Sequence, residues 1–464
     1  MKKTVLFIAL MLIFSGCTSS FGADEIRSTP TANVAESPYL DMESLFPDEE
    51  FREEVLDELA RIFDRKKDFT QEDLNGVTEI GCYGSVEGIK NLCNLKKLYV
   101  YCDITAGQEE LGQLESLSKI HIYKTVTHLE PLTDINNAQT WYVSSFSQIE
   151  DISIVSTLSN VEALDIDMDI FDWDIIKLFP NLKKISLYYV EVEDCDTILA
   201  LKDSPTLEVL KFEDAWIDLG VLSALNNVKV LEMKYPVYAT NCASIDGFEN
   251  LEILDFPEPD FGLDIKGLEN IPNLRQINFE CAHLENIKTI SKITNLETLD
   301  LTFCYLGQDG EYEKDLENIG FLGGLINLKN LTLHDNEISD IDVLGNLTNL
   351  MCLYIKDNNI SDISALENLT MLTDLNIEEN FIEDITPLSN LTELTELNIS
   401  ENSISDISAL SNLTNLVELD ISENNITDLT PLLGLPNLKI LDVSNNPIED
   451  YSVLDQLDLD ELYK

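Results

Sequence analysis

The amino-acid sequence predicts an α/β solenoid, a right-handed horseshoe of about 17 short parallel strands with a helical cap at its N-terminal end. Three observations predict this fold. The C-terminal part of the chain repeats itself every 22 residues, each repeat carries a pair of apolar residues at period 2, and an amphipathic helix precedes the first repeat. Fixed self-similarity over tens of residues is typical of solenoids, in which each unit closes the core of its neighbour.

The period is clearest in residues 331–464, where an asparagine and, four positions later, an aspartate recur in every repeat. The asparagines are Asn336, Asn358, Asn380, Asn402, Asn424 and Asn446, and the aspartates are Asp340, Asp362, Asp384, Asp406, Asp428 and Asp450. An asparagine at the bend can bond backbone groups that the turn leaves unpaired, and can reach the next repeat. A short carboxylate beside a tight turn accepts from nearby backbone N–H groups. Both series are therefore predicted to serve the fold rather than a ligand.

Each repeat also contains an L-x-[LIV] pair, whose side chains form the inward face of a short strand. In the regular part, residues 331–464, the pairs start at Leu331, Leu353, Leu375, Leu397, Leu419 and Leu441. A degenerate part, residues 77–330, contains further pairs that start at Ile80, Leu98, Ile120, Trp141, Leu164, Ile185, Leu210, Leu231, Leu254, Ile277 and Leu299. The step from Leu299 to Leu331 is 32 residues, which predicts one repeat with an insertion around Gln308 to Glu317.

A helical cap is predicted over residues 46–76, because a solenoid needs its first open face covered. Apolar residues recur at helical spacing from Phe51 to Phe63, and Asp48 is a suitable N-cap for this helix. Thr70-x-x-Asp73 then predicts the start of a second short helix.

The segment LTELTELNISENSISDISAL, residues 391–410, resembles the bacterial leucine-rich repeat of internalin-like proteins, written L-x-x-L-x-L-x-x-N-x-I-x-D-I-x-x-L. The resemblance extends from about Val77 and is most specific from Leu331 onward. The segments FPDEEFREEVLDELARIF and DFTQEDLNGVTEI are similar to the cap that precedes such repeats in that family. The degenerate part departs from the pattern, because its asparagine position holds residues such as Val190, Ala215, Pro236, Pro259 and Cys304.

Residues 1–17 are predicted to be a lipoprotein signal peptide. Lys2 and Lys3 precede a short apolar run, and Ser15-Gly16-Cys17 resembles the bacterial lipobox, in which the cysteine is acylated. A plain cleaved signal peptide is the alternative. Residues 18–45 are rich in Ser, Thr, Ala and Pro without periodicity and are expected to form a flexible tether. These features predict a lipoprotein of the bacterial cell surface, bound to the membrane only through a lipid on Cys17.

Charge and motifs exclude several classes of function. With 29 basic and 86 acidic residues the formal charge is −57, which disfavours nucleic acid and anionic lipid as targets. Acidic surfaces also favour solubility, so the charge by itself does not indicate a ligand. The sequence contains no G-x-S-x-G, H-E-x-x-H, P-loop or G-x-G-x-x-G motif and no calcium-binding loop of the D-x-[DN]-x-[DN]-G type. We therefore expect no catalysis, no cofactor and no dedicated metal site.

The cysteines leave two interpretations open. Cys82 and Cys304 fall where the repeat places buried residues, which favours free thiols. Cys82, Cys93 and Cys102 lie in neighbouring repeats, so a disulfide among them is also possible in an extracellular protein.

The candidate binding residues belong to the concave sheet, the usual working surface of a curved solenoid. Because side chains alternate along a strand, the residues that flank each inward apolar residue face outward. The predicted site is Lys97, Tyr99, Tyr101, Lys119, His121, Tyr123, Tyr142 and Tyr188. Tyrosine and lysine are typical of interfaces with an acidic protein partner, although tyrosine is also stable on any sheet. The regular part has acidic and small polar residues instead, such as Glu396 and Glu418, and is expected to act as a spacer.

The predicted function is protein–protein binding or adhesion by a lipid-anchored, extracellular, monomeric protein without catalytic activity. Two alternatives remain. Similar 22-residue repeats occur in phosphatase regulatory subunits, so the chain could be an intracellular regulator of that kind. It could also be an accessory subunit of a surface enzyme.

Overall fold

The computed structural model describes residues 39–464, apart from residues 66, 168–172, 190–200, 203, 219–221, 223, 236–237, 241–247, 260–261 and 307–313. The chain divides into two units, Met1–Tyr39 and Leu40–Lys464, and the described helices and strands belong to the second. Cys17 and the predicted signal peptide lie outside the described residues, as do Val190 and Pro236.

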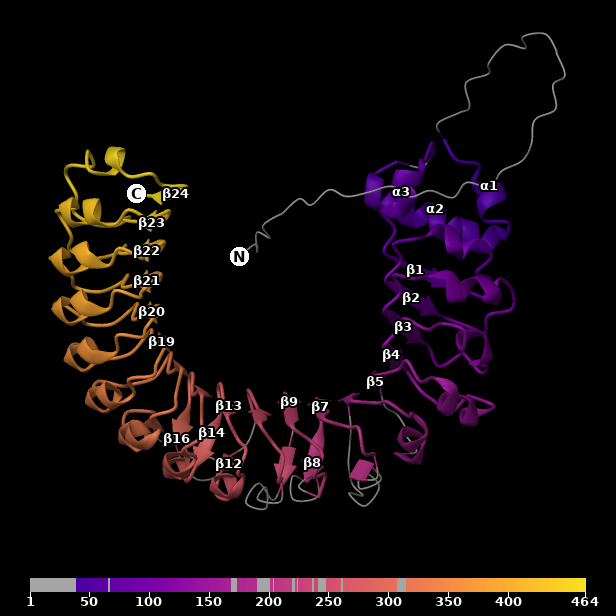
Figure 1. Cartoon of the computed structure of the whole chain (residues 1–464), viewed down its shortest axis with the longest axis horizontal. Helices are drawn as coiled ribbons and strands as arrows, with labels where there is room; N and C mark the ends of the chain where they lie inside the picture. The colour runs from indigo at the N-terminus through magenta and orange to yellow at the C-terminus, as the bar shows by residue number, and fades with distance from the viewer. Residues whose placement is uncertain are drawn as a thin grey trace, which may run out of the picture. The chain divides into compact units, whose positions relative to one another are not determined.

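The second unit is built on one open, curved sheet, in which 18 parallel strands follow one another in chain order along the concave side (Figure 1). The strands are β1 (Glu79–Cys82), β2 (Lys97–Val100), β3 (Lys119–Ile122), β4 (Thr140–Val143), β5 (Ala163–Asp167), β6 (Lys184–Tyr188), β7 (Val209–Glu213), β9 (Val230–Lys234), β11 (Ile253–Asp255), β13 (Gln276–Asn278), β15 (Thr298–Asp300), β18 (Asn330–Thr332), β19 (Cys352–Tyr354), β20 (Asp374–Asn376), β21 (Glu396–Asn398), β22 (Glu418–Asp420), β23 (Ile440–Asp442) and β24 (Glu461–Tyr463). The predicted α/β solenoid is confirmed.

The sheet extends one strand beyond the last predicted pair. β24 continues the parallel sheet from β23, with Leu462 opposite Leu441. The sequence signal was weak here, because the acidic segment DLDELYK contains neither the asparagine nor the second apolar residue of the pair. The strand forms because its backbone completes the hydrogen bonds that the edge of β23 would otherwise leave open.

The register makes the core continuous and aligns the outward residues. Leu98 lies opposite Ile120, and Val100 lies opposite Ile122. All four side chains are buried. Because the side-chain period of a strand is two, the same register places outward residues of successive strands side by side in rows.

Short 3-10 helices form most of the convex side of the solenoid (Figure 1). They are η1 (Ile89–Asn91), η2 (Gln108–Gln113), η3 (Glu130–Leu132), η4 (Ile152–Thr157), η5 (Trp173–Leu178), η8 (Leu268–Asn270), η9 (Ile287–Lys292), η10 (Gly320–Gly324), η11 (Asp342–Asn346), η12 (Ser364–Asn368), η13 (Thr386–Asn390), η14 (Ser408–Asn412), η15 (Thr430–Gly434) and η16 (Leu454–Gln456). A 3-10 helix covers more distance per residue than an α-helix, so a few residues suffice to cross the width of a repeat.

Two smaller sheets accompany the middle repeats. One pairs β8 (Trp216–Asp218) with β10 (Tyr238–Thr240), and the other contains β12 (Gly262–Asp264), β14 (His283–Glu285), β16 (Tyr305–Leu306) and β17 (Lys314–Asp315). β17 pairs antiparallel with β16 and belongs to the predicted insertion around Gln308 to Glu317. Residues 307–313 of that insertion lie outside the described residues.

Three helices form the N-terminal cap: α1 (Met42–Leu45), α2 (Glu49–Phe63) and α3 (Gln71–Asn75). Asp48 caps α2, because its side chain accepts from the backbone N–H of Phe51 at 2.8 Å. Thr70 and Asp73 form a capping box at the start of α3. α1 lies within residues 18–45, the segment that was expected to form a tether. The ordered contacts begin even earlier, because the Leu40 N–H donates to the Phe69 carbonyl at 2.9 Å. In the described part of the chain, every helix is too short or too polar to cross a bilayer.

Candidate functional site

The predicted binding residues lie on strands β2, β3, β4 and β6 or directly after them. Lys97 and Tyr99 belong to β2, Lys119 and His121 to β3, Tyr142 to β4 and Tyr188 to β6, while Tyr101 and Tyr123 follow the ends of β2 and β3. In β2 the inward Leu98 and Val100 are buried, whereas Lys97 and Tyr99 are partly exposed. The alternation therefore presents these side chains on the concave sheet, as predicted.

Most of the rings form two rows, which together we call the aromatic patch: Tyr83, Tyr99, Tyr101, His121, Tyr123 and Tyr142. In the first row, ring centroids lie 4.6 Å apart between Tyr99 and His121, and 5.2 Å apart between His121 and Tyr142. In the second row, Tyr101 lies between Tyr83 and Tyr123, with 4.6 Å to each. The prediction did not include Tyr83, although its position two residues after Gly81 repeats that of Tyr101 after Tyr99.

Tyr188 lies beside the aromatic patch rather than in a row. Strand β5 separates it from β4, and Asp165 of β5 lies opposite Tyr142. The centroids of Tyr142 and Tyr188 are 6.5 Å apart and their rings are tilted by 54°. The first row therefore ends at Tyr142 as a stack, with Tyr188 as an outlying contact.

Gly81 makes room for the second row. It lies opposite Tyr99 in the sheet. A Cβ atom at this position would lie only 2.7 Å from Cε2 of Tyr101. The ring of Tyr101 therefore occupies space that any side chain at residue 81 would take. Glycine is required at residue 81 because the ring of Tyr101 approaches the backbone closely there.

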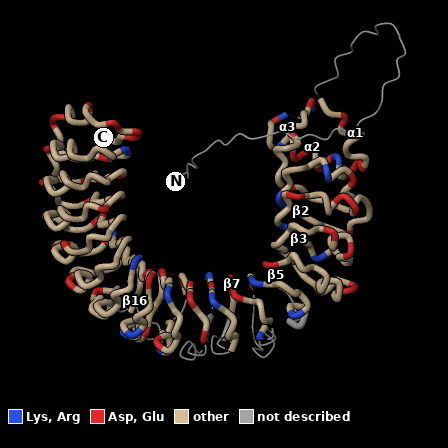
Figure 2. The backbone as a smooth tube through the Cα atoms, in the orientation of Figure 1, with Lys and Arg blue, Asp and Glu red and all other residues tan. Residues whose placement is uncertain are grey.

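Positive charge beside the aromatic patch is partly compensated. Lys97 Nζ lies 3.5 Å from Glu79 Oε2, and the Tyr99 hydroxyl donates to the same oxygen at 3.2 Å. Lys119 lies opposite Lys97 and forms no ion pair with any described residue. Figure 2 shows that basic residues gather in the N-terminal and middle repeats, while acidic residues occur along the whole tube.

Burial moves the pKa values of three rings in the aromatic patch, Tyr99, Tyr101 and His121, away from neutral pH. Burial, together with the neighbouring Tyr123 and Tyr83, raises the pKa of Tyr101 to about 12. Burial and the Glu79 carboxylate raise the pKa of Tyr99. Burial, with a smaller contribution from Lys97, lowers the pKa of His121. The surface thus offers phenol O–H groups and a neutral imidazole for hydrogen bonding.

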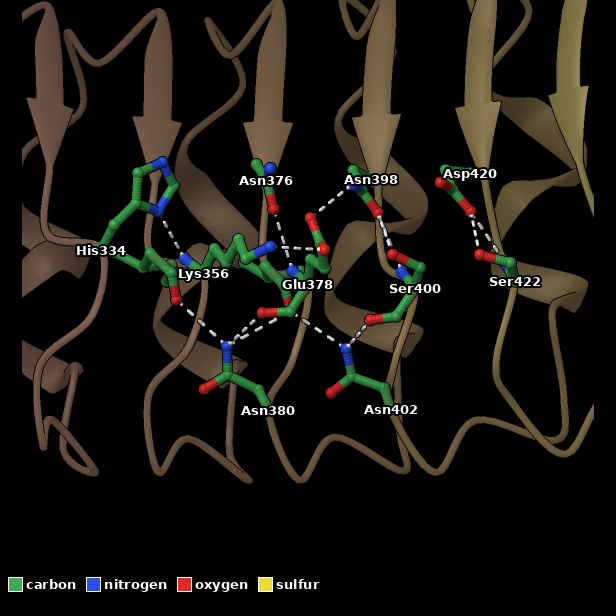
Figure 3. A network of polar contacts seen from close by, with 12 residues as sticks. His334, Lys356, Asn376, Glu378, Asn380, Asn398, Ser400, Asn402, Asp420 and Ser422 are labelled. Carbon is green, nitrogen blue, oxygen red and sulfur yellow. Dashed lines mark hydrogen bonds and ion pairs between the residues drawn. The ribbon is translucent and has the colours of Figure 1, made fainter. Parts of the chain in front are cut away.

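The regular part contains a polar cluster where we expected only a spacer (Figure 3). His334 Nδ1 accepts the backbone N–H of Lys356 at 2.9 Å. Lys356 Nζ lies 2.7 Å from Glu378 Oε1, and Asn398 Nδ2 donates to Glu378 Oε2 at 2.9 Å. Lys356 is the single Lys or Arg between positions 330 and 438 of the sequence, which was an available signal. The polar groups of this cluster bind one another, so the cluster stabilises this part of the sheet.

The repeated asparagines and aspartates satisfy the backbone, as predicted. Asn380 Nδ2 donates to the carbonyls of Ile355 at 3.0 Å and Ile377 at 3.3 Å, and its Oδ1 accepts from the N–H of Ile360 at 3.0 Å. Asn402 makes the equivalent bonds one repeat later (Figure 3). Asp384 Oδ1 accepts from the N–H of Thr386 at 2.8 Å.

A second series of asparagines was missed by the sequence analysis. Each lies four residues before the inward residue of a strand, and its amide donates to a backbone carbonyl of the preceding repeat. This edge asparagine ladder consists of Asn94, Asn137, Asn160, Asn181, Asn227, Asn250, Asn273, Asn295, Asn327, Asn349, Asn415 and Asn437. The series from Asn336 to Asn446, which we call the central asparagines, is confined to the regular part, whereas the edge asparagine ladder extends through the degenerate part. Its signal was a constant offset from each strand rather than a fixed period.

From Glu162 to Lys329, charged residues alternate in sign along the same edge, two residues before the inward residue of each strand from β5 to β18. This edge ion-pair column joins Lys183 to Glu162, Lys229 to Glu208, Arg275 to Glu252 and Lys329 to Glu297. Three of these pairs have N–O distances of 2.9, 2.7 and 2.8 Å. Exposed pairs of this type stabilise a protein by about 0–1 kcal/mol each.

The described cysteines are free thiols, namely Cys82, Cys93, Cys102, Cys281, Cys304 and Cys352. Cys82 and Cys304 are buried, and burial raises the pKa of Cys82 to about 12. The structure thus favours the free-thiol interpretation over a disulfide among Cys82, Cys93 and Cys102. Cys195 and Cys242 lie outside the described residues. Among the residues that the structure describes, no cluster of three or more His, Cys, Asp or Glu could hold a metal ion.

Residues 326–368, 370–412, 392–433 and 414–456 match the family model for leucine-rich repeats, two copies at a time. The chain contains leucine-rich repeats. The matched segments begin five residues before the regular part and end within it, and the parallel sheet continues through the degenerate part.

Solved structures similar to this leucine-rich repeat protein include two internalins of Listeria monocytogenes. Internalin InlF is 23% identical over 93% of this chain and 98% of that one, with a TM-score of 0.42. Internalin C2 is 32% identical over 44% of this chain and 83% of that one, with a TM-score of 0.36. The leucine-rich repeats that the predicted resemblance implied are confirmed by the family model.

A further similar structure is that of a TLR13–ssRNA13 complex. It is 17% identical over 82% of this chain and 65% of that one, with a TM-score of 0.52, a likeness of fold alone. Among curated proteins, none matches the chain.

Proposed function

We propose that this leucine-rich repeat protein binds a protein partner through the aromatic patch while a lipid on Cys17 holds it at the bacterial cell surface. The observation that carries the proposal is the pair of stacked aromatic rows on the concave sheet. Binding is the function, and no catalysis by this chain is involved.

Two physical features suit the aromatic patch to binding. Tyr101 has a ring on each side at 4.6 Å, so its conformation is set before a partner arrives. Rigid aromatic side chains lose little conformational entropy on binding and are frequent anchors of interfaces. Neighbouring rings, with centroids 4.6 to 5.2 Å apart, shield part of each other's faces, and their edges and hydroxyl groups remain for the partner. Such a surface suits the packing and hydrogen bonding of a protein better than the stacking of a sugar ring.

The binding test compares two pairs of substitutions on the concave sheet. Purified protein serves as bait, and a captured partner is then titrated against each variant. Tyr99→Ala with Tyr123→Ala should weaken binding at least tenfold, or about 1.4 kcal/mol, with little change in thermal melting. Glu396→Gln with Glu418→Gln is the matched control and should change binding little. Loss of binding in the control pair, with retention in the tyrosine pair, would show that the aromatic patch is not the site.

Membrane anchoring rests on Ser15-Gly16-Cys17 after a short apolar run. Cys17→Ala should leave the membrane fraction or accumulate with residues 1–17 uncleaved, whereas Cys93→Ala, a control at an exposed thiol, should behave as the unmodified protein. Continued processing and membrane attachment of Cys17→Ala would rule out the lipoprotein proposal.

The same fractionation decides between the proposal and an intracellular regulator of the phosphatase type. A regulator would remain in the cytoplasm with residues 1–17 attached, and its captured partner would be an intracellular enzyme. An accessory subunit of a surface enzyme would co-purify with that enzyme from the membrane, again through the aromatic patch.

A further inference from the structure

The edge asparagine ladder and the edge ion-pair column are both interrupted between β18 and β20. The ion-pair column runs to Lys329, and the next residue in it is Met351. The asparagine ladder is unbroken from Asn227 to Asn349, Met371 takes the next position in it, and it resumes at Asn415. Both methionines are exposed, by 39% and 48%.

A groove of about 610 Å³ lies along this edge and ends at the two methionines. Arg275 and Lys329 line it from the ion-pair column, and Asn327 and Asn349 line it from the asparagine ladder. Met351 and Met371 complete its lining. Ile326, whose carbonyl accepts the Asn349 amide at 2.8 Å, is itself 56% exposed.

Met371 is unfavourable for the fold in two respects. An asparagine in its place would reach the carbonyl of Thr348, as Asn415 reaches that of Thr392 at 2.9 Å. The methionine gives up this bond and also exposes an apolar side chain to water. A residue that breaks a local rule without a structural gain is frequently retained for function.

We propose that this edge groove is a second docking site, which receives an extended, uncharged segment of a partner protein with an aliphatic side chain placed on Met351 and Met371. Methionine side chains are flexible and polarisable, so they adapt to an aliphatic group of variable shape. The Asn side chains flank the groove with amide groups suited to a neighbouring peptide backbone.

The charges of the groove determine this choice of occupant. Glu252 pairs with Arg275, and Glu297 lies 2.8 Å from Lys329, so the four charges cancel within the lining. A cationic or anionic segment would gain no unpaired countercharge and would have to compete with these pairs. A second copy of the chain is disfavoured because each copy has a formal charge of −57.

The test uses the full chain and a random peptide library displayed on phage. Met351→Thr with Met371→Asn is the informative variant, because Thr373, Asn327 and Asn349 show that the fold accepts these residues at the same repeat positions. Its melting temperature should equal or exceed that of the unmodified protein, since residue 371 regains a backbone bond. Val417→Thr is the matched control, because Val417 is 40% exposed in the same column but does not line the groove.

Peptides enriched on the unmodified chain should be uncharged and rich in Leu, Ile or Val. Synthetic versions should bind at least tenfold more weakly to the double methionine variant and equally well to Val417→Thr. They should also bind normally to Tyr99→Ala with Tyr123→Ala, which separates this site from the aromatic patch. Enrichment of charged peptides, or binding that does not depend on Met351 and Met371, would overturn the proposal.

Discussion

His334 supplies a hydrogen-bond acceptor to Lys356, one repeat further along the sheet, through a 2.9 Å bond from the Lys356 backbone N–H to the imidazole Nδ1. In the following repeats an Asn or Asp two residues earlier takes this role. Asn376 Oδ1 accepts from the N–H of Glu378 at 3.0 Å, for example (Figure 3). Tyr354 stands at the corresponding position before Lys356 and has no acceptor of that reach. His334 therefore supplies the hydrogen-bond acceptor that Tyr354 cannot provide.

This relationship predicts a rescue. His334→Ala should destabilise the fold by about 1–3 kcal/mol, because the Lys356 N–H loses its partner in a partly buried site. Adding Tyr354→Asn should recover part of the loss, since the new side chain can accept as Asn376 does. Amide hydrogen exchange at Lys356 and chemical unfolding measure both effects. An equally large loss in Tyr354→Asn alone, with no recovery in the double variant, would contradict this account.

The same histidine predicts a pH dependence. Burial lowers the pKa of His334 below its ordinary value of 6.5. The unfolded chain therefore binds more protons at this residue than the folded chain does, and stability falls as pH falls from about 6.5 towards the lower folded value. His334→Gln, which keeps an acceptor but does not titrate, should show a smaller drop in melting temperature between pH 7.5 and pH 5.5. An unchanged drop would assign the pH dependence to other groups.

Gly81 predicts a way to disturb the aromatic patch without removing a ring. Gly81→Ala places a Cβ 2.7 Å from the present Cε2 position of Tyr101, so this ring must move away from Tyr83 and Tyr123. Near-ultraviolet circular dichroism should change, and affinity for the partner should fall several-fold. Gly345→Ala is a matched control in the regular part, where the nearest atom to a new Cβ is a carbonyl oxygen at 3.2 Å. A spectrum and affinity unchanged by Gly81→Ala would show that the row tolerates a side chain there.

The central asparagines predict a large position-specific cost. Asn380→Ala removes an acceptor from the Ile360 N–H and a donor from the Ile355 carbonyl, both buried. Unsatisfied buried groups cost about 1–3 kcal/mol each, so the loss should be several times that of Asn359→Ala. Asn359 is exposed and directly follows Asn358, a member of the same series as Asn380, which makes it a suitable control. Equal losses in chemical unfolding would mean that water replaces the bonds of Asn380.

Much of the fold could be predicted because its signals are local. Leu331 and Leu353 indicate strands, because each starts an apolar pair at a period of two. The spacing of Asn380 and Asp384 indicates a turn, and Asp48 indicates the start of a helix. Strand β24 could not be predicted in this way, because Leu462 lacks the second apolar residue and the asparagine that follow the first apolar residue in the regular repeats. The outward positions of Tyr99 and His121 followed from the same alternation, so their place on the concave sheet was accessible from the sequence.

The sequence by itself determined the repeat, the inward faces, the central asparagine series and the cap, since each depends on residues a few positions apart. Only the tertiary structure decided that Tyr99 packs against His121, that Tyr101 lies over Gly81, and that Met351 and Met371 end one groove. These contacts join residues about one repeat apart, and their distances depend on strand register and on the space each neighbour leaves. Repeat length varies along the degenerate part, so counting positions does not show which side chains meet.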